Sequence, residues 1–227
     1  MENKTKYIKG LDGLRALAVI MVLAYHLKIP FAKSGLLGVT VFFVLSGFLI
    51  TRILITEIEE THTIDLKNFW VRRIRRLIPA VLSMAVVIIF VSAVVNRVVF
   101  TKGCKDFVAS VLGFNNWWQI FNKVSYFEAA GAPSPFTHCW SLAIETQFYL
   151  IYPLLLLLLA RVVRGRKKRG KVFAIVSALL AVVSMILMAV LYNPNGDPSR
   201  VYYGTDTRAF ALLIGALAAI QLEYRII

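Results

Sequence analysis

The amino-acid sequence predicts an all-α fold: a polytopic transmembrane helical bundle with about six crossings plus a re-entrant or interfacial segment. Of the 227 residues, 59% are hydrophobic and 17% are charged. The apolar residues are gathered in blocks of about twenty, the length that a helix needs to cross a hydrocarbon core about 30 Å thick. The basic residues lie between these blocks, as in the loops of membrane proteins. These observations exclude a soluble globular domain and make the lipid bilayer the first expected partner.

Six apolar blocks are long enough to be spans. The first follows basic residues, as in a signal peptide, but it lacks a small-residue cleavage site and predicts an uncleaved helix. A weaker block at 107–121 is interrupted by Asn115 and Asn116 and continues with Trp117 and Trp118, which suits a segment that does not face lipid. The six strong blocks lie at 14–29, 36–55, 77–95, 139–160, 172–192 and 208–222.

The formal net charge of +14 does not indicate a nucleic-acid partner, because the basic residues cluster in short loops and not on one soluble face. Short loops rich in Lys and Arg mark the cytoplasmic side. With a cytoplasmic N-terminus, all three clusters fall on that side only if 107–121 dips in and returns on the outer side. We therefore expect a multi-pass protein of the cell membrane. The clusters are Lys4, Lys6 and Lys9; Arg72, Arg73, Arg75 and Arg76; and the basic residues of 161–171.

Charged side chains are costly in a bilayer, so those inside the blocks are the first candidates for function. In the first block, Arg15 and His26 are eleven residues apart, which returns them to one helix face about 16 Å apart along the axis. A neutral imidazole there could accept a proton. The structural alternative is an ion pair between Asp12 and Arg15, with His26 satisfied by a neighbouring carbonyl.

A second set of polar side chains forms one helical stripe within 138–152. Glu145 could be an acid/base group, could orient an imidazole, or could be half of an ion pair with Arg15 or Arg208. Trp140 and Gln147 face roughly the opposite way and should pack against or bond a neighbouring helix. The stripe consists of His138, Glu145, Tyr149 and Tyr152.

The entry to the last block carries Tyr203, Asp206 and Arg208. At a helix start an aspartate caps backbone N–H groups, and this is the role that we predict for Asp206. Tyr202 and Tyr203 could simply be aromatic residues of the membrane interface. Together with His138 and Tyr149, the residues Tyr203, Asp206 and Arg208 are the candidates for an acceptor side.

The arginine cluster of residues 68–79 lies at the inner membrane surface and alternates basic pairs with apolar anchors. Arginine grips phosphate bidentately, so the cluster could bind a phosphate-bearing cosubstrate. An ordinary positive-inside anchor is the alternative. The candidate donor-binding residues are Arg72, Arg73, Arg75 and Arg76.

Cys104 and Cys139 lack the spacing of metal ligands, so we expect no metal site. We also expect no bound cofactor. The predicted topology places both near the outer face, where a disulfide is an option, but two idle thiols are the preferred interpretation.

With these residues in place, the chain resembles the acyltransferase type 3 family of membrane O-acetyltransferases, and within it the peptidoglycan O-acetyltransferases of Gram-positive bacteria. The resemblance covers nearly all of residues 1–227 as one membrane domain. It rests on five motifs in the order of the family, at residues 10–19 with His26, 38–50, 69–79, 138–150 and 203–208.

The resemblance implies transfer of an acyl group, by expectation acetyl, from cytoplasmic acetyl-coenzyme A to a hydroxyl of an extracytoplasmic cell-wall or surface glycan. It implies His26 as the catalytic group, together with Arg15 and Glu145. It also implies that the four arginines of the cluster bind the phosphates of coenzyme A. It further implies more membrane helices beyond residue 227 and a C-terminal or separate esterase-like domain that accepts the acyl group. The alternatives are a transporter or flippase of lipid-linked glycan or ions, and an inactive truncated remnant.

Overall fold

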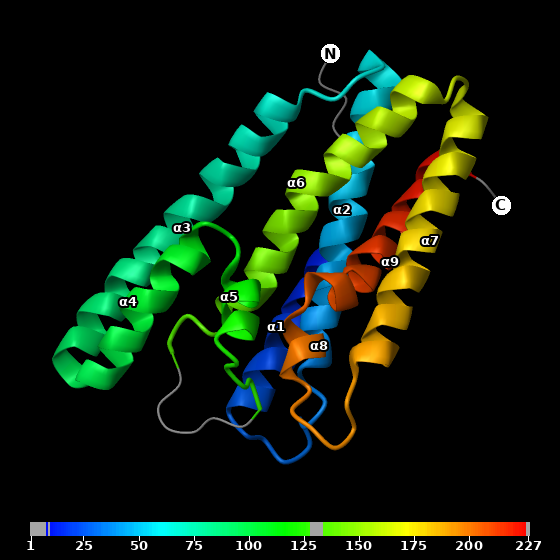
Figure 1. The fold of residues 1–227 in the computed structure, drawn as a ribbon. Helices are drawn as coiled ribbons and strands as arrows, with labels where there is room; N and C mark the ends of the chain where they lie inside the picture. Colours follow the sequence, from blue (N-terminus) through cyan, green and yellow to red (C-terminus); the bar gives the residue numbers. More distant parts are fainter. Residues whose placement is uncertain (1–7, 9, 128–133, 226–227) are drawn as a thin grey trace. The chain divides into compact units, whose positions relative to one another are not determined.

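The structure is a computed structural model that describes residues 8, 10–127 and 134–225. The predicted basic cluster of Lys4, Lys6 and Lys9 lies outside these residues. Throughout the described ranges every regular element is a helix, which confirms the all-α prediction. The helices (Figure 1) are α1 Gly10–His26, α2 Leu37–Thr61, α3 Leu66–Val95, α4 Arg97–Val111, α5 Asn115–Phe121, α6 Cys139–Val162, α7 Arg166–Leu191, α8 Ser199–Tyr203 and α9 Thr205–Tyr224.

Five of these helices are long and apolar enough to cross a membrane, namely α2, α3, α6, α7 and α9. They correspond to five of the six strong blocks and support a polytopic bundle. The first block forms α1, which has 17 residues. At 1.5 Å per residue it is about 25 Å long, somewhat shorter than the hydrocarbon core. It ends at His26, three residues before the predicted end, because the chain turns at Lys28 with a φ of 56°.

The weak block at 107–121 is not one helix. Its first part completes α4, the chain turns at Gly113 with a φ of +74°, and α5 adds seven residues. A positive φ is readily adopted by glycine, which has no Cβ. The segment is therefore broken by a turn, and among the described residues it does not provide a sixth crossing helix.

Helix α3 is longer than the predicted span because it begins at Leu66 and includes the whole arginine cluster. The carboxylate of Asp65 caps it by accepting a hydrogen bond from the Asn68 backbone N–H at 3.0 Å. This bond also lowers the pKa of Asp65. At the other end, Asn96 caps α4 by accepting from Val98 and Val99. The cluster is thus the first part of a membrane helix rather than a loop.

The chain divides into two compact units. The first comprises Met1–Ile64, Pro153–Val183 and Ala209–Ile227, and the second comprises Asp65–Tyr152 and Ser184–Arg208. Helices α6, α7 and α9 each contribute to both units.

The first unit is built on close helix crossings at glycines. A Cβ on Gly47 of α2 would overlap the Leu212 carbonyl of α9, and a Cβ on Gly215 of α9 would overlap the Val44 carbonyl of α2. In the same way, a Cβ on Gly38 would lie 2.5 Å from the carbonyl oxygen of Ala18 in α1. Small residues let backbones approach where no hydrophobic force drives helices together in lipid.

Ion pairs join three helices of the first unit. Arg52 of α2 donates to Glu223 of α9 at 2.7 Å, and Arg169 of α7 lies 3.2 Å from Glu59 of α2. The Tyr224 hydroxyl also donates to Glu59, at 2.7 Å. All four charged side chains are largely buried, so the pairing satisfies groups that would otherwise be costly to bury.

Candidate functional site

Helix α1 positions two of the predicted site residues. Arg15 lies 3.3 Å from Asp12, and both side chains are partly exposed. This is the ion pair of the structural alternative. Arg15 and His26 lie about 16 Å apart along the helix, so Arg15 does not contact the imidazole directly.

The His26 ring is held by its own helix. Its Nδ1 lies 2.8 Å from the carbonyl oxygen of Val22, one turn earlier. Because a carbonyl only accepts, Nδ1 must carry the hydrogen, and in the neutral ring the lone pair is then on Nε2. The ring is exposed in this chain and meets Tyr25 edge-on, with 5.3 Å between ring centroids. The Nδ1 edge of the ring is thus oriented by a backbone carbonyl of the same helix.

The arginine cluster on α3 has one inward member and three outward ones. Arg72, Arg75 and Arg76 are exposed, whereas Arg73 is half-buried over the ring of Phe69, 5.5 Å from its centroid. The Nε of Arg73 is buried and has no hydrogen-bond partner within the described part of the chain. Buried donors in folded proteins are usually satisfied by the protein or by ordered water, so this N–H can serve an acceptor outside the described chain.

In the second unit, α6 brings Tyr149, which is bonded to Glu145 one turn earlier, to the part of α3 that carries this arginine. The Tyr149 hydroxyl donates to Glu145 at 3.2 Å, and Trp70 of α3 donates to the backbone carbonyl of Tyr149 at 3.1 Å. Arg73 lies within electrostatic range of Tyr149. Tyr149 therefore links the two candidates, because it donates to Glu145 and lies within electrostatic range of Arg73, and this was not evident from their distance in the sequence.

Gln147, on another face of α6, is the centre of a hydrogen-bond network. Its Nε2 donates to the Gly113 carbonyl and to Asn116, both at 2.9 Å. Its Oε1 accepts from Trp117 at 3.1 Å and from the hydroxyl of Thr205. The predicted bond from Gln147 to a neighbouring helix is confirmed. The network fixes the start of α9 against α5.

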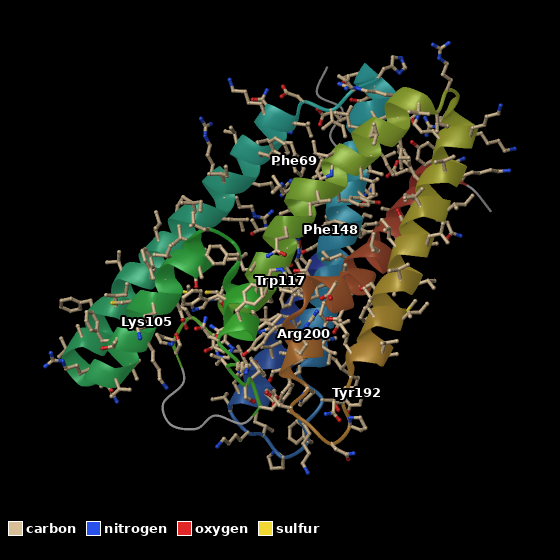
Figure 2. All side chains as sticks on the ribbon, in the orientation of Figure 1. Phe69, Lys105, Trp117, Phe148, Tyr192 and Arg200 are labelled. Carbon is tan, nitrogen blue, oxygen red and sulfur yellow. The ribbon has the colours of Figure 1, made fainter. Side chains whose placement is uncertain are left out.

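Asp206 forms a bidentate pair with Arg200 of α8. The two bonds measure 3.1 Å and 2.7 Å, and the guanidinium also lies over the Trp117 ring, 5.4 Å from its centroid. Figure 2 labels Trp117 and Arg200, which come together from α5 and α8. We predicted a capping role for Asp206, but its carboxylate is engaged by Arg200. Arg200 was missed because no helical period links it to Asp206 across the turn at Gly204.

Aromatic rings collect around Tyr202 and Tyr203. Trp140 of α6 lies 4.4 Å from Tyr202 between ring centroids, which confirms its predicted packing role. Tyr126 contacts Tyr202 at 4.7 Å and the imidazole of His138 at 5.9 Å. Tyr202 and Tyr203 are 6% and 0% exposed, so the interpretation of the pair as residues of the membrane interface is wrong.

Burial raises the pKa of the Tyr203 hydroxyl well above its usual range, with a smaller contribution from Tyr126. The hydroxyl therefore stays protonated near neutral pH and is a donor. Within the described residues it has no hydrogen-bond partner.

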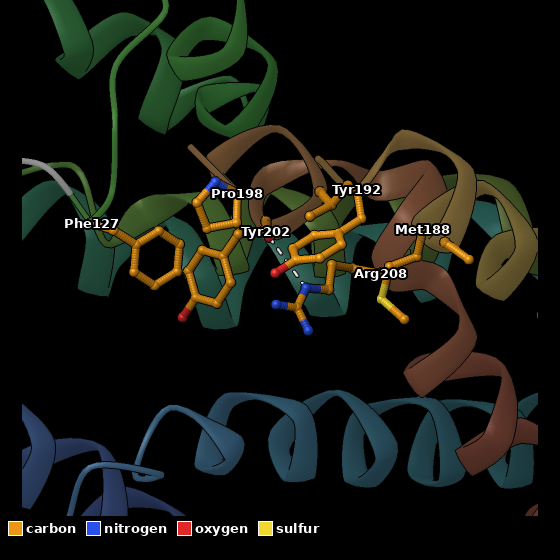
Figure 3. Close-up of a pocket in the computed structure, with 8 residues that line it drawn as sticks. Phe127, Met188, Tyr192, Pro198, Tyr202 and Arg208 are labelled. Atoms are coloured by element: carbon orange, nitrogen blue, oxygen red, sulfur yellow. Dashed lines mark hydrogen bonds between the residues drawn. The ribbon is translucent and has the colours of Figure 1, made fainter. Parts of the chain in front are cut away.

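Next to this cluster is a cavity of about 370 Å³ (Figure 3). The described residues that line it are aromatic and aliphatic, with Phe127, Tyr192 and Tyr202 among them, and Arg208 is the charged one of this set. The Arg208 guanidinium lies over the Tyr202 ring at 4.7 Å, and its Nε donates to the Tyr202 carbonyl at 3.4 Å (Figure 3).

The acceptor-side candidates thus fall into three places in the second unit. His138 and Tyr203 belong to the aromatic cluster, with Arg208 beside it in the cavity, whereas Asp206 belongs to the pair with Arg200. Tyr149 belongs with Glu145, about 16 Å along α6 from His138. Sequence reasoning missed Phe127 and Tyr192, because both lie outside helices, where no periodicity relates them to Arg208.

Both cysteines are free, with Cys104 exposed and Cys139 buried, so the pair does not form a disulfide.

Comparison with known proteins agrees with these motifs. A family described as the acyltransferase domain matches residues 8–226. The peptidoglycan O-acetyltransferase OatA of Listeria monocytogenes is 50% identical over 214 residues, which cover 94% of this chain and 34% of OatA. YrhL of Bacillus subtilis, a provisional peptidoglycan O-acetyltransferase by name, is 47% identical over 223 residues, with 97% and 34% covered.

The chain spans about a third of the length of these relatives. No solved structure matches it. The family match extends over nearly the whole chain and includes each of the candidate site residues. This chain therefore belongs to the family described as the acyltransferase domain, and it is similar to these O-acetyltransferases.

Proposed function

We propose that the chain is a membrane unit for O-acetyl transfer. Acetyl-coenzyme A is the donor on the cytoplasmic side, and the acceptor is a hydroxyl of an extracytoplasmic cell-wall glycan. The observation that carries the proposal is Arg73, which lies within electrostatic range of Tyr149, the partner of Glu145, and has a buried Nε without a hydrogen-bond partner among the described residues. Family membership and the name of the Listeria relative support the type of chemistry.

The donor site consists of the first turns of α3. Three exposed arginines give a basic surface for the phosphates of coenzyme A, and arginine forks bind phosphate bidentately. Arg73 faces inward and supplies a buried N–H for an acceptor atom of the donor. In this proposal the exposed arginines bind the phosphates, and Arg73 binds another acceptor atom of the same donor.

His26 is the general base in this proposal. With its hydrogen on Nδ1 and shared with the Val22 carbonyl, Nε2 accepts the proton of an attacking hydroxyl. The hydroxyl oxygen, on the glycan or on a relay group of the protein, forms a bond with the thioester carbonyl carbon. The carbon–sulfur bond then breaks, coenzyme A leaves as the thiolate, and the proton held by the imidazole passes to that sulfur.

The donor site is tested by changing Arg72 and Arg73 together to glutamine. We expect acetyl-coenzyme A to bind more weakly and with less dependence on salt, because fewer phosphate contacts remain. Arg164→Gln with Lys168→Gln is the matched control, since it removes the same charge from another basic segment. Unchanged donor affinity in a correctly inserted Arg72/Arg73 variant would contradict the proposal.

The chemistry is tested with His26→Gln and Glu145→Gln. Loss of a general base lowers turnover by about 10²–10⁴-fold, and glutamine retains hydrogen bonding without accepting a proton near neutral pH. Glu145→Gln should lower turnover while acetyl-coenzyme A still binds. Normal acetyl transfer in His26→Gln would exclude it as the base, and glycan movement without any thioester would favour a transporter.

A further inference from the structure

We propose that the joined ends of α6 and α7 form a binding surface for an anionic phospholipid. The headgroup phosphate lies on basic side chains, and the acyl chains lie along the two helices. The inference does not depend on acyl transfer, because it concerns the lipid around the protein and neither the donor nor the acceptor. It is carried by the charge of residues 161–171 and by the exposed apolar residues next to them, all of which belong to the first unit.

The charged residues of the segment 161–171 are all basic. The segment contains seven Lys and Arg residues and no Asp or Glu. One of the seven, Arg169, is buried and lies 3.2 Å from Glu59, whereas the other six are exposed. The whole chain has 26 Lys and Arg residues and 12 Asp and Glu residues, so its own carboxylates cannot neutralise every basic side chain. The segment therefore favours an external anion.

The helices on either side hold this segment at the membrane surface. Both α6 and α7 are long and apolar enough to cross a membrane, and only residues 163–165 join them (Figure 1). A connection this short keeps the basic side chains at the level of the lipid headgroups. Headgroup phosphates are therefore the anions nearest to them, and clusters of basic residues beside a membrane helix are typical of binding to anionic lipid.

Exposed apolar residues continue from the basic residues along both helices. Residues three or four apart share a helix face, and on each helix one such exposed stripe joins apolar side chains to a basic one. The stripe of α6 consists of Leu154, Leu158 and Arg161, and that of α7 consists of Lys171, Ile175, Leu179 and Val182. Each helix thus offers an apolar surface to an acyl chain and a cation to the phosphate at its end.

The basic end of α7 is also fixed by the end of α9. The Arg166 guanidinium lies over the Tyr224 ring, 5.7 Å from its centroid, and its Nη2 donates to the Glu223 carbonyl at 3.0 Å. Gly170 permits this close contact, because a Cβ there would lie 2.5 Å from the Tyr224 ring. A surface that is already fixed loses little conformational entropy when it binds a headgroup.

The experiment titrates the chain in a neutral detergent with phosphatidylglycerol or with phosphatidylcholine of the same acyl chains, and bound lipid is counted by native mass spectrometry. We expect phosphatidylglycerol to bind at least about tenfold more tightly, since each basic residue near an anionic headgroup contributes about fivefold. The preference should shrink between about 0.1 M and 1 M salt, where the screening distance falls from about 10 Å to about 3 Å.

Variants assign the preference to the two stripes. Arg161→Gln with Lys171→Gln should weaken phosphatidylglycerol about tenfold to thirtyfold and leave phosphatidylcholine unchanged. Five basic residues of the segment remain, so membrane insertion should be retained. Arg161→Lys with Lys171→Arg keeps both charges and should keep the preference. Arg97→Gln with Lys105→Gln is the matched control, because it removes two exposed charges from α4, and it should bind as the wild type does.

Four outcomes would overturn the inference. Equal binding of the two lipids to the wild type would show that no anionic headgroup is selected, and this comparison needs no variant that might misfold. A preference that persists in the folded Arg161/Lys171 glutamine variant would place the lipid elsewhere. An equal loss in the α4 control would reduce the effect to net charge. Displacement of phosphatidylglycerol by acetyl-coenzyme A would assign the segment to a soluble phosphate-bearing ligand.

Discussion

Gln147 uses its complete hydrogen-bonding capacity, with two N–H groups donating and one oxygen accepting twice. A single side chain thereby connects α6 to α5 and to the start of α9. Its partners include Trp117 and Thr205, so it also supports the region that holds Arg200 and Asp206. Gln147 carries no charge, yet the positions of Arg200 and Asp206 depend on the hydrogen bonds that it makes.

Gln147→Met should therefore lower stability markedly. The side chains are similar in size, but methionine leaves several buried polar groups without partners, each at about 1–3 kcal/mol. We expect a clear fall in the Tm measured in detergent. Gln221→Met is the matched control, because Gln221 is exposed on α9 and should tolerate the change. Equal Tm values for the two variants would contradict the network.

At the scale of elements, α2 and α9 cross so closely that only glycine fits at Gly47 and Gly215. Gly47→Ala should separate the helices, because the added carbon would meet the Leu212 carbonyl, which is backbone and not a flexible side chain. We expect destabilisation at or above the upper end of the about 1–3 kcal/mol usual for overpacking.

Gly13→Ala is the control for that variant. Gly13 lies inside α1, and a Cβ there would meet no atom within 4 Å. Alanine should stabilise the helix by about 0.5–1 kcal/mol. Thermal unfolding of the two variants in the same detergent measures both effects, and a tolerated Gly47→Ala would show that the crossing is looser than described.

The cap of α3 predicts a pH dependence. The hydrogen bond from Asn68 lowers the pKa of Asp65 in the folded state, so folding favours the ionised carboxylate. Its contribution is complete above the unfolded pKa of about 3.9 and is lost as the pH falls through the lower folded value. Asp65→Ala should therefore have a lower Tm than the wild type at pH 7. The difference should shrink below about pH 4, and a difference independent of pH would exclude the charged cap.

At the scale of the whole molecule, topology follows from where the basic segments lie. If residues 161–171 are cytoplasmic and 107–121 does not cross, Val124 lies outside and Lys168 inside. In a Cys104→Ser background, Val124→Cys should react with an impermeant thiol reagent added to intact cells. Lys168→Cys should react only after the membrane is opened. Both positions are exposed, so accessibility within the fold does not limit labelling. The reverse pattern would invert the orientation.

The sequence by itself determined the helical membrane fold, five of the crossing helices, the break near Asn115 and the family. These features depend on composition and on spacing within one short stretch of chain, without any contact to another stretch. Examples are an apolar block of about twenty residues, a glycine in a turn, and a short motif such as that around Glu145. Helix periodicity also predicted that Glu145 and Tyr149 share a face, and that Gln147 faces roughly the opposite way and packs against or hydrogen-bonds to a neighbouring helix.

Only the tertiary structure decided which polar groups are partners. The pairing of Asp206 with Arg200, the approach of Arg73 to Tyr149 and the cavity at Arg208 join segments from different helices and loops. No period in the chain relates such segments, so their charges could be recognised as costly in a membrane but not assigned to one another. The physical reason is that a buried polar group must find its partner in space, and packing between helices determines which partner is within reach.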